Sequence, residues 1–340
     1  MDRRTFLQGA ASAALLGASP ARAKLKVGQI GTEHSHAAGK METVRRLSEH
    51  FEVVGLVGKS PAKAYEGLPR LDEAALFGDP DVKLVVVETD VREATAAARR
   101  AVEAGKHVHL DKPGGLDHAA FRAMRLLAQE QGRIVQMGYM LRHNPAFELL
   151  FRAVREGWLG EVAEVTATMG KQASPAARQE LAGWPGGGMF ELGCHLVDAA
   201  LTLLGPPAKV TAYGRSTGVD GLPDNQLAVL EYPKALVTLR CNHNDPDGFA
   251  RRSFEVVGTQ GSIRIAPLES GKLTLQLARA AGGYEKGAHA LQLKLPAGRY
   301  DGEFLHLAAA IRGEAPFGWS AAHDIVVHAT ALAAAGVLSK

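Results

Sequence analysis

The sequence between residues 24 and 137 alternates short apolar runs with longer alanine-rich stretches, and this alternation limits the fold more than any other feature. The apolar runs, expected to be strands, lie at 24–30, 51–57, 82–88, 107–110 and 134–137. The run within 82–88 is apolar on both faces, as a buried parallel strand requires. Strands that alternate with helices of this length predict βαβ units in a parallel, doubly wound sheet. Ligands of such sheets bind at the carboxyl edge of the strands.

The pattern changes after about residue 145. Helices are expected at 147–156 and 192–204, and a further helical region from 302 onward. The segments expected to be strands are 162–169, 209–214, 226–231, 235–241, 253–257, 262–266 and 272–277. The spacing of the segments from 209 onward predicts an antiparallel meander. With 340 residues, two domains are expected. We therefore predict an α/β protein with a Rossmann-like domain at 24–144 and an α+β domain with a largely antiparallel sheet at 145–340.

The first 23 residues are interpreted as an export signal. Arg3 and Arg4 precede Phe-Leu, a short apolar stretch follows, and the segment ends Ala-x-Ala at Ala23. The paired arginines resemble a twin-arginine signal, although an amphipathic basic N-terminus is the alternative. We expect cleavage after Ala23 and a periplasmic mature protein. The apolar stretch is too short to span a bilayer, so no membrane association is expected after processing.

Charge and cysteine content exclude two classes of protein. The formal charge of +3 includes the basic N-terminal segment, and the rest of the chain carries about +1. No block of Lys and Arg alternates with aromatic residues, so no nucleic-acid partner is expected. The two cysteines, Cys194 and Cys241, are too few for a disulfide scaffold. A protein exported after folding in a reducing cytoplasm is not expected to join them.

The turn after the first strand is the expected place for a dinucleotide phosphate. Gly31 stands directly after the strand, as the tight turn of a dinucleotide-binding motif requires. Glu33 occupies the place of the second glycine, where a carboxylate opposes a pyrophosphate unless it points away. Thr32 and His34 complete the candidate loop. An ordinary βα turn is the alternative interpretation.

The end of the second strand favours NADP over NAD. An NAD site usually places Asp or Glu there to accept a hydrogen bond from the ribose 2′-hydroxyl. Here Lys59 and Ser60 follow the strand and no carboxylate does. A cation and a hydroxyl suit a 2′-phosphate, although a solvated lysine in a surface turn is the alternative.

Three later segments resemble one family. Residues 104–113 (AGKHVHLDKP), 138–145 (GYMLRHNP) and 186–198 (GGGMFELGCHLVD) are similar in order and spacing to motifs of the Gfo/Idh/MocA family, named for glucose–fructose oxidoreductase and inositol dehydrogenase. The resemblance covers about residues 24–205 and extends plausibly to the end. It implies a nicotinamide cofactor, a sugar or cyclitol substrate, an open antiparallel sheet in the second domain, and a homodimer or homotetramer.

The resemblance also implies site residues. Lys112, Glu191 and His195 stand where the family has its catalytic lysine, aspartate and histidine. A histidine can accept the hydroxyl proton during alcohol oxidation, and a nearby ammonium can stabilise the developing alkoxide. Glu191 and His195 are four residues apart, so on one helix they would share a face. The structural alternatives are a strand-end lysine, a buried histidine and a carboxylate at a helix N-terminus.

Further residues follow from the same segments. Besides the turn and Lys59–Ser60, the expected cofactor contacts are Thr89, Asp111, Lys112 and Pro113. The expected substrate contacts include Arg142 and Asp198, and Asp198 has the alternative role of holding His195. The chain departs from the family pattern where Asp90, Ala94, Asp111 and Glu191 replace Pro, His, Glu and Asp.

Two histidine pairs raise the question of a metal. His34 and His36 are separated by one residue, as are His107 and His109. A catalytic zinc needs a third protein ligand, and the sequence places none beside either pair. No metal is therefore expected.

The combined reading predicts a periplasmic NAD(P)-dependent oxidoreductase of a sugar, cyclitol or sugar-derived alcohol. Because free nicotinamide cofactor should be scarce there, the cofactor is expected to travel bound and to be regenerated in place. One alternative is glycoside hydrolysis or elimination with a retained dinucleotide and no net redox. A second is a sugar-binding protein on a decayed Rossmann fold, which Glu33, Asp90 and Ala94 favour.

Overall fold

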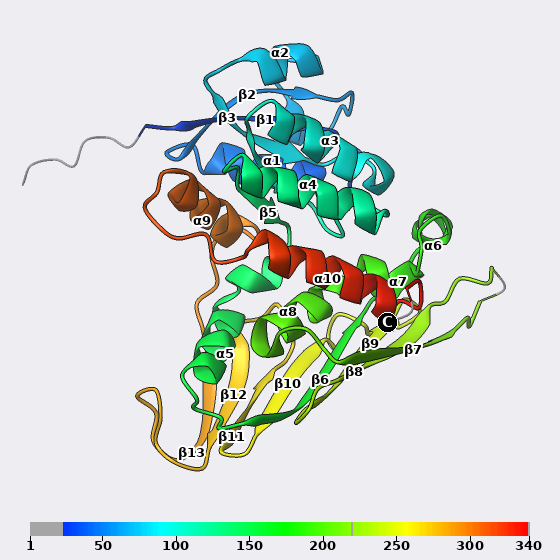
Figure 1. Cartoon of the computed structure of the whole chain (residues 1–340), viewed down its shortest axis with the longest axis vertical. Helices are drawn as coiled ribbons and strands as arrows, with labels where there is room; N and C mark the ends of the chain where they lie inside the picture. The colour runs from blue at the N-terminus through cyan, green and yellow to red at the C-terminus, as the bar shows by residue number, and fades with distance from the viewer. Residues whose placement is uncertain (1–22, 219, 339–340) are drawn as a thin grey trace, which may run out of the picture.

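Five parallel strands form the N-terminal sheet in the order β2-β1-β3-β4-β5 (Figure 1). A computed structural model describes residues 23–218 and 220–338, so nearly all of the predicted export signal lies outside the described residues. The strands are β1 (Leu25–Ile30), β2 (Phe51–Val57), β3 (Val82–Val87), β4 (His107–Leu110) and β5 (Val135–Met137). The parallel, doubly wound sheet predicted from the sequence is confirmed.

Helices cover both faces of this sheet. They are α1 (Ala37–Arg46), α2 (Glu73–Gly78), α3 (Val91–Glu103) and α4 (His118–Glu130). Asp90 and Asp117 cap α3 and α4, because their carboxylates accept hydrogen bonds from first-turn amides. The face opposite α3 and α4 is covered by α1 and by α9 (Asp301–Ile311), whose Phe304 and Leu307 pack against β1 and β3. A helix near the C-terminus thus completes the N-terminal layer.

Eight strands form the second sheet, in the order β13-β12-β11-β10-β6-β9-β8-β7. They are β6 (Val162–Gly170), β7 (Lys209–Arg215), β8 (Asn225–Glu231), β9 (Leu236–Asn242), β10 (Ser253–Gly258), β11 (Gly261–Ile265), β12 (Lys272–Leu277) and β13 (Gly287–Gln292). The largely antiparallel sheet predicted for the second domain is confirmed, but its strands do not form a single meander, because β6 lies between β9 and β10 and runs parallel to β9. The strand β13 was not predicted from the sequence.

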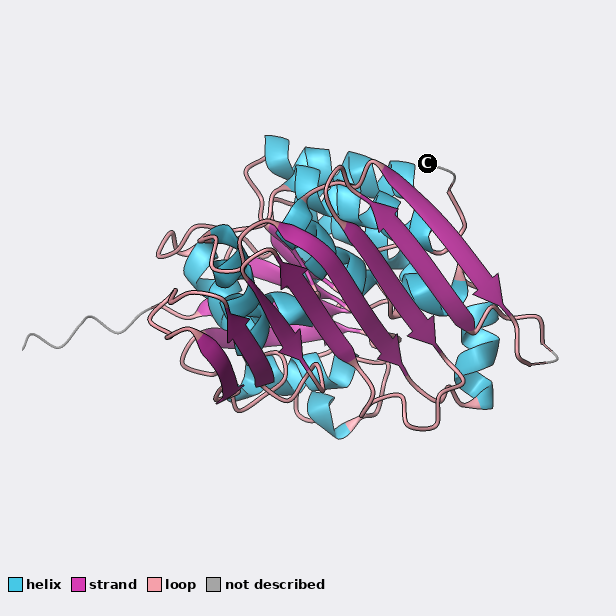
Figure 2. Ribbon diagram, turned by 90° about the horizontal axis from the view of Figure 1, so that it is seen from below, coloured by secondary structure: helices cyan, strands magenta, loops and turns pink. Residues whose placement is uncertain are grey.

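One face of this large sheet is covered by helices and the other is open (Figure 2). The remaining helices are α5 (Pro145–Arg155), α6 (Pro175–Ala182), α7 (Gly187–Glu191), α8 (Cys194–Leu204) and α10 (Ala321–Ala334). α10 packs against both α4 and α8 and so joins the two sheets' helical layers. No helix among the described residues is long and apolar enough to cross a membrane. Cys194 and Cys241 are both free and buried.

Candidate active site

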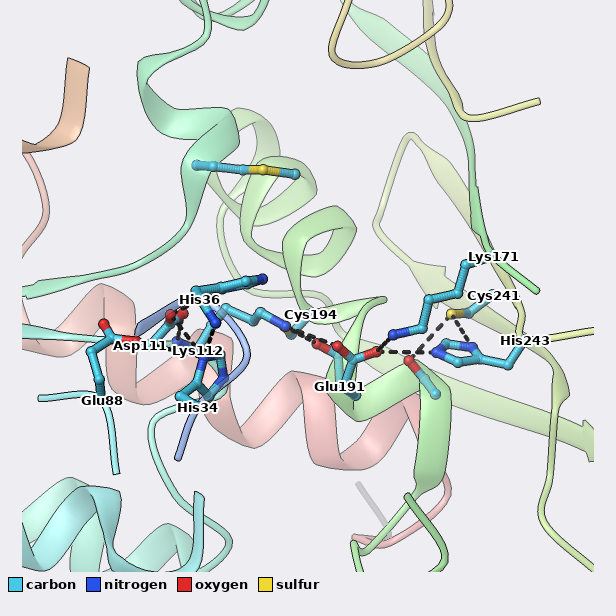
Figure 3. A network of polar contacts seen from close by, with 12 residues as sticks. His34, His36, Glu88, Asp111, Lys112, Lys171, Glu191, Cys194, Cys241 and His243 are labelled. Atoms are coloured by element: carbon cyan, nitrogen blue, oxygen red, sulfur yellow. Dashed lines mark hydrogen bonds and ion pairs between the residues drawn. The ribbon is translucent and has the colours of Figure 1, made fainter. Parts of the chain in front are cut away.

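A cluster of charged side chains lies where the two sheets' strand ends approach each other. Lys112 follows β4 of the N-terminal sheet. Lys171 follows β6 and His243 follows β9, and these two strands are parallel with their last residues paired. Because parallel strands end at the same edge of a sheet, the two side chains are neighbours. Glu191, the last residue of α7, lies between them and Lys112 (Figure 3).

The Glu191 carboxylate joins three partners. Its Oε1 lies 3.1 Å from Lys112 Nζ, which also donates to the Glu191 carbonyl at 3.0 Å. Its Oε2 lies 2.9 Å from Lys171 Nζ and 3.1 Å from His243 Nε2. Lys171 and His243 were not predicted as site residues from the sequence. Their place directly after paired strands is the signal that could have found them.

Glu191 and Lys112 are each stabilised in the charged form. Burial opposes ionisation of Glu191, but the ammonium of Lys112 and the hydrogen bond with His243 hold the pKa of the carboxyl well below its usual range. Burial also opposes the charge of Lys112, yet the Glu191 carboxylate leaves the lysine pKa above its usual value. The pair is therefore a carboxylate and an ammonium near neutral pH.

His195 is buried near this pair. Its side chain lies on α8, edge-on to the Tyr139 ring at 5.9 Å between centroids, and its Nδ1 has no hydrogen-bond partner. Burial and the charge of Lys112 hold the pKa of His195 well below its usual value, so the imidazole is neutral. The shared helix face predicted for Glu191 and His195 is wrong, because α7 ends at Glu191 and α8 begins at Cys194.

Arg142 and Asp198, expected to contact substrate, lie instead in a buried ion-pair network. The Arg142 guanidinium donates to Asp198 at 2.6 Å and to Asp324 of α10 at 2.6 Å. His323 Nε2 lies 3.2 Å from Asp198, so Asp198 does not hold His195. Although burial opposes ionisation, Arg142 and His323 lower the pKa of Asp198 to about 2. The expected substrate role of Arg142 and Asp198 is therefore replaced by a structural one. The sequence did not predict this network because Asp324 is distant from both residues along the chain.

The predicted phosphate turn is closely packed. Gly31 has φ of +83°, and a Cβ there would lie 2.4 Å from the Thr89 amide nitrogen. This contact explains why a glycine follows β1 and why Thr89 borders the turn. The Thr32 amide donates to the Glu33 carboxylate at 2.7 Å, and Glu33 is exposed. Glu33 can therefore turn outward without leaving a buried charge.

The end of β2 carries basic and hydroxyl groups. Lys59 is exposed, and the Ser60 hydroxyl accepts a hydrogen bond from the Ala62 amide. The Arg70 guanidinium donates to the carbonyls of Gly58 and Ser60 at 2.9 and 2.8 Å. Arg70 was not predicted from the sequence because it lies thirteen residues beyond the end of β2 and returns to that strand through a bridge with Leu56.

His34 and His36 meet a third side chain beneath the turn. Asp111, which follows β4, lies 3.2 Å from His34 Nδ1 and 3.0 Å from His36 Nδ1 through its Oδ2. The parallel sheet brings the end of β4 beside the turn after β1, which spacing alone did not reveal. His107 and His109 have other partners and join no such group.

A doubly wound domain whose strand ends face lysine, histidine and carboxylate side chains of a second domain defines a two-domain nucleotide-dependent enzyme. Two family models match the chain. The model described as "Oxidoreductase family, NAD-binding Rossmann fold" matches residues 25–139, and that of the GFO/IDH/MocA C-terminal domain matches residues 147–264. The chain belongs to the Gfo/Idh/MocA family of oxidoreductases.

Curated relatives and solved structures agree with this assignment. Trans-1,2-dihydrobenzene-1,2-diol dehydrogenase of Bos taurus is 30% identical over 55% of this chain and 58% of its own length. The 1,5-anhydro-D-fructose reductase of Ensifer adhaerens is 27% identical over 73% of this chain and 74% of its own length. GenD2 from gentamicin A biosynthesis, solved in complex with NAD, is 20% identical, with a TM-score of 0.76 over 93% of this chain and 94% of its own. The last likeness shows the fold alone.

Proposed function

We propose that this chain transfers a hydride between a nicotinamide cofactor and a sugar, cyclitol or sugar-derived alcohol. The observation that carries the proposal is the buried Lys112 ammonium, held by Glu191 and close to a neutral histidine, at the carboxyl edge of a nucleotide-type sheet. Diol and anhydrofructose enzymes among the relatives support a polyhydroxylated substrate.

The residues at this edge fit a dinucleotide. The turn at Gly31 and Thr32 would face the phosphates, with the Glu33 carboxylate turned outward. Lys59, Ser60 and Arg70 would face the ribose of the adenosine half. When bound, the nicotinamide ring accepts or supplies the hydride. Because the end of β2 carries cations and no carboxylate, NADP is favoured over NAD.

The substrate's reacting carbon would lie among Lys112, Glu191 and His195. The Lys112 ammonium donates a hydrogen bond to the reacting oxygen and stabilises negative charge on it in the transition state. The neutral imidazole of His195 accepts the hydroxyl proton during oxidation and returns it during reduction. Lys171 and His243 hold Glu191 in place while its carboxylate accepts hydrogen bonds from substrate hydroxyl groups.

Two broader proposals concern location and assembly. The twin-arginine segment supports export to the periplasm with the cofactor already bound and regenerated there by a second substrate.

The open face of the large sheet supports a homodimer or homotetramer. Leu236 of β9 is 57% exposed and is followed by buried Val237, and Tyr213 of β7 is 53% exposed and has the opposite strand parity to buried Val210, so both lie on that open face. Exposed apolar side chains on an uncovered sheet are typical of an interface.

A substrate screen tests the proposal. The purified protein, loaded with NADP⁺ or NADPH, is mixed with aldoses, ketoses, cyclitols and vicinal diols, and nicotinamide absorbance is followed. We expect at least one polyhydroxylated compound to change that absorbance and to yield the matching oxidised or reduced product by mass spectrometry. Cleavage of a glycoside with no net change in nicotinamide would replace the proposal with the hydrolytic alternative.

A further inference from the structure

Three carboxylates are buried around one lysine beneath the β1–α1 turn. The side chains of Glu88, Asp111 and Glu303 are 0%, 4% and 1% exposed, and that of Lys40 is fully buried. Lys40 Nζ lies 3.4, 2.8 and 3.9 Å from their respective oxygens. One ammonium balances one carboxylate, so two negative charges remain if all three are ionised. Uncompensated charge is costly in a protein interior, so further positive charge is required there.

Two imidazoles face the same carboxylate oxygen. Nδ1 of His34, Nδ1 of His36 and a carboxylate oxygen of Asp111 all lie within 4.8 Å of one another. The His36 amide lies 3.2 Å from Nδ1 of His34 and donates to it, so that nitrogen is unprotonated and would exchange this hydrogen bond for a bond to an ion. Unprotonated imidazole nitrogen is the form that binds metal ions.

Glu88 supplies an independent observation. Its side chain has no exposed surface, and neither carboxylate oxygen has a hydrogen-bond partner. Its Oε2 lies 3.6 Å from Nδ1 of His34, and the side chain lies beside Asp111 and the two histidines (Figure 3). Lys40 lies 3.4 Å away but balances only one of the three carboxylates, so Glu88 needs a further cation or a proton.

We propose that His34, His36 and Asp111, with Glu88 beside them, bind one divalent transition-metal ion. Two imidazole nitrogens and one or two carboxylate oxygens suit Zn²⁺, Mn²⁺, Fe²⁺ or Co²⁺. A divalent ion would offset the two negative charges that Lys40 leaves unbalanced. The expectation from spacing alone, that no metal binds, is replaced because Asp111 supplies the third ligand. The ion would lie at the border of the candidate active site, since Asp111 directly precedes Lys112.

The competing arrangement has protons in place of the ion. In that case Glu88 would be a neutral carboxylic acid, in keeping with burial, which raises its pKa. The two arrangements differ in metal content, which is measured directly and without any catalytic assay. The outcome therefore does not depend on whether the proposed hydride transfer is correct.

Co²⁺ is the probe. The purified full chain, without an added histidine tag, is stripped with a chelator, titrated with Co²⁺, dialysed and analysed by visible absorption and inductively coupled plasma mass spectrometry. We expect a visible d–d band that saturates near one ion per chain. Less than a tenth of an ion per chain and no band would overturn the proposal, even with no variant made.

Substitutions of the proposed ligands test where the ion binds. His36→Asn removes one ligand and should weaken Co²⁺ binding at least tenfold, and Glu88→Gln should weaken it by a smaller factor. His289→Asn, on β13 at the edge of the large sheet, is the matched control and should bind as the native protein does. Circular dichroism confirms that each variant is folded. Native affinity in a folded His36→Asn variant would place the ion elsewhere and overturn the assignment.

Discussion

Replacing Lys112 by Met gives the sharpest test of the candidate reacting centre. The substitution removes a 2%-exposed ammonium and retains a side chain of similar length. In the native site that ammonium lies 3.1 Å from Glu191 and is available to the substrate oxygen. Loss of one preorganised donor at a developing oxyanion typically lowers kcat by about 10²–10³-fold, equivalent to about 2.7–4 kcal/mol. We expect a loss of that size for Lys112→Met.

Lys112→Met should lower the free energy of unfolding by less than the loss of one partner from an ordinary buried ion pair does. Glu191 keeps Lys171 at 2.9 Å and His243 at 3.1 Å, so its carboxylate remains compensated. We expect a loss of about 1–3 kcal/mol in the free energy of unfolding, the usual cost of leaving one buried group without its partner. An uncompensated buried charge would cost about 3–5 kcal/mol.

The assay pairs steady-state NADPH oxidation, with the substrate found by screening, and urea unfolding followed by circular dichroism. Lys209→Met, at an exposed ion pair on β7, is the control and should leave both measurements unchanged. A folded Lys112→Met variant with kcat within threefold of the native value would refute the role given to Lys112.

The remaining predictions concern the cofactor and the buried network. Arg70→Glu should raise the KM for NADPH at least tenfold and change the KM for NADH much less, because the 2′-phosphate would lose a cationic partner. Lys59→Ala should have the same effect to a smaller degree. Equal increases in the KM values for NADPH and NADH would contradict the NADP preference. Arg142→Leu leaves Asp198 and Asp324 without their shared guanidinium and should cost about 3–5 kcal/mol in urea unfolding, whereas a loss under about 1 kcal/mol would contradict the network's role. Because the folded pKa of Asp198, about 2, lies below its unfolded value, its contribution is present above pH 4 and is lost as pH falls through 2. Acid titrations should show this loss in the native protein and a smaller one in Asp198→Asn.

The fold of the N-terminal domain could be predicted because local signals and global architecture agree. Apolar strands buried on both faces, alternating with helices, admit few arrangements besides a doubly wound sheet. The second sheet could be predicted only as a set of strands. Nothing in the spacing of 162–169 shows that β6 inserts between two later meanders and pairs in parallel with β9, since that pairing depends on contacts distant in sequence.

The residues of the candidate site also fall into those that local sequence patterns identify and those that only the three-dimensional fold brings together. Lys112, Glu191 and His195 came from residues within short segments that resemble family motifs. Lys171, His243 and Arg70 came from strand pairing and loop return, which no local pattern encodes. Arg142 illustrates the converse error, because a motif residue that sequence reasoning assigns to substrate is paired with two buried aspartates.

Native mass spectrometry of the purified protein, followed by denaturation and identification of released nucleotide, tests the central claim most directly. The account predicts NADP(H) released at near one per chain, or taken up to that level on incubation. If neither NADP(H) nor NAD(H) is released or taken up, the oxidoreductase account is contradicted, and the Glu33 carboxylate closes the turn to phosphate.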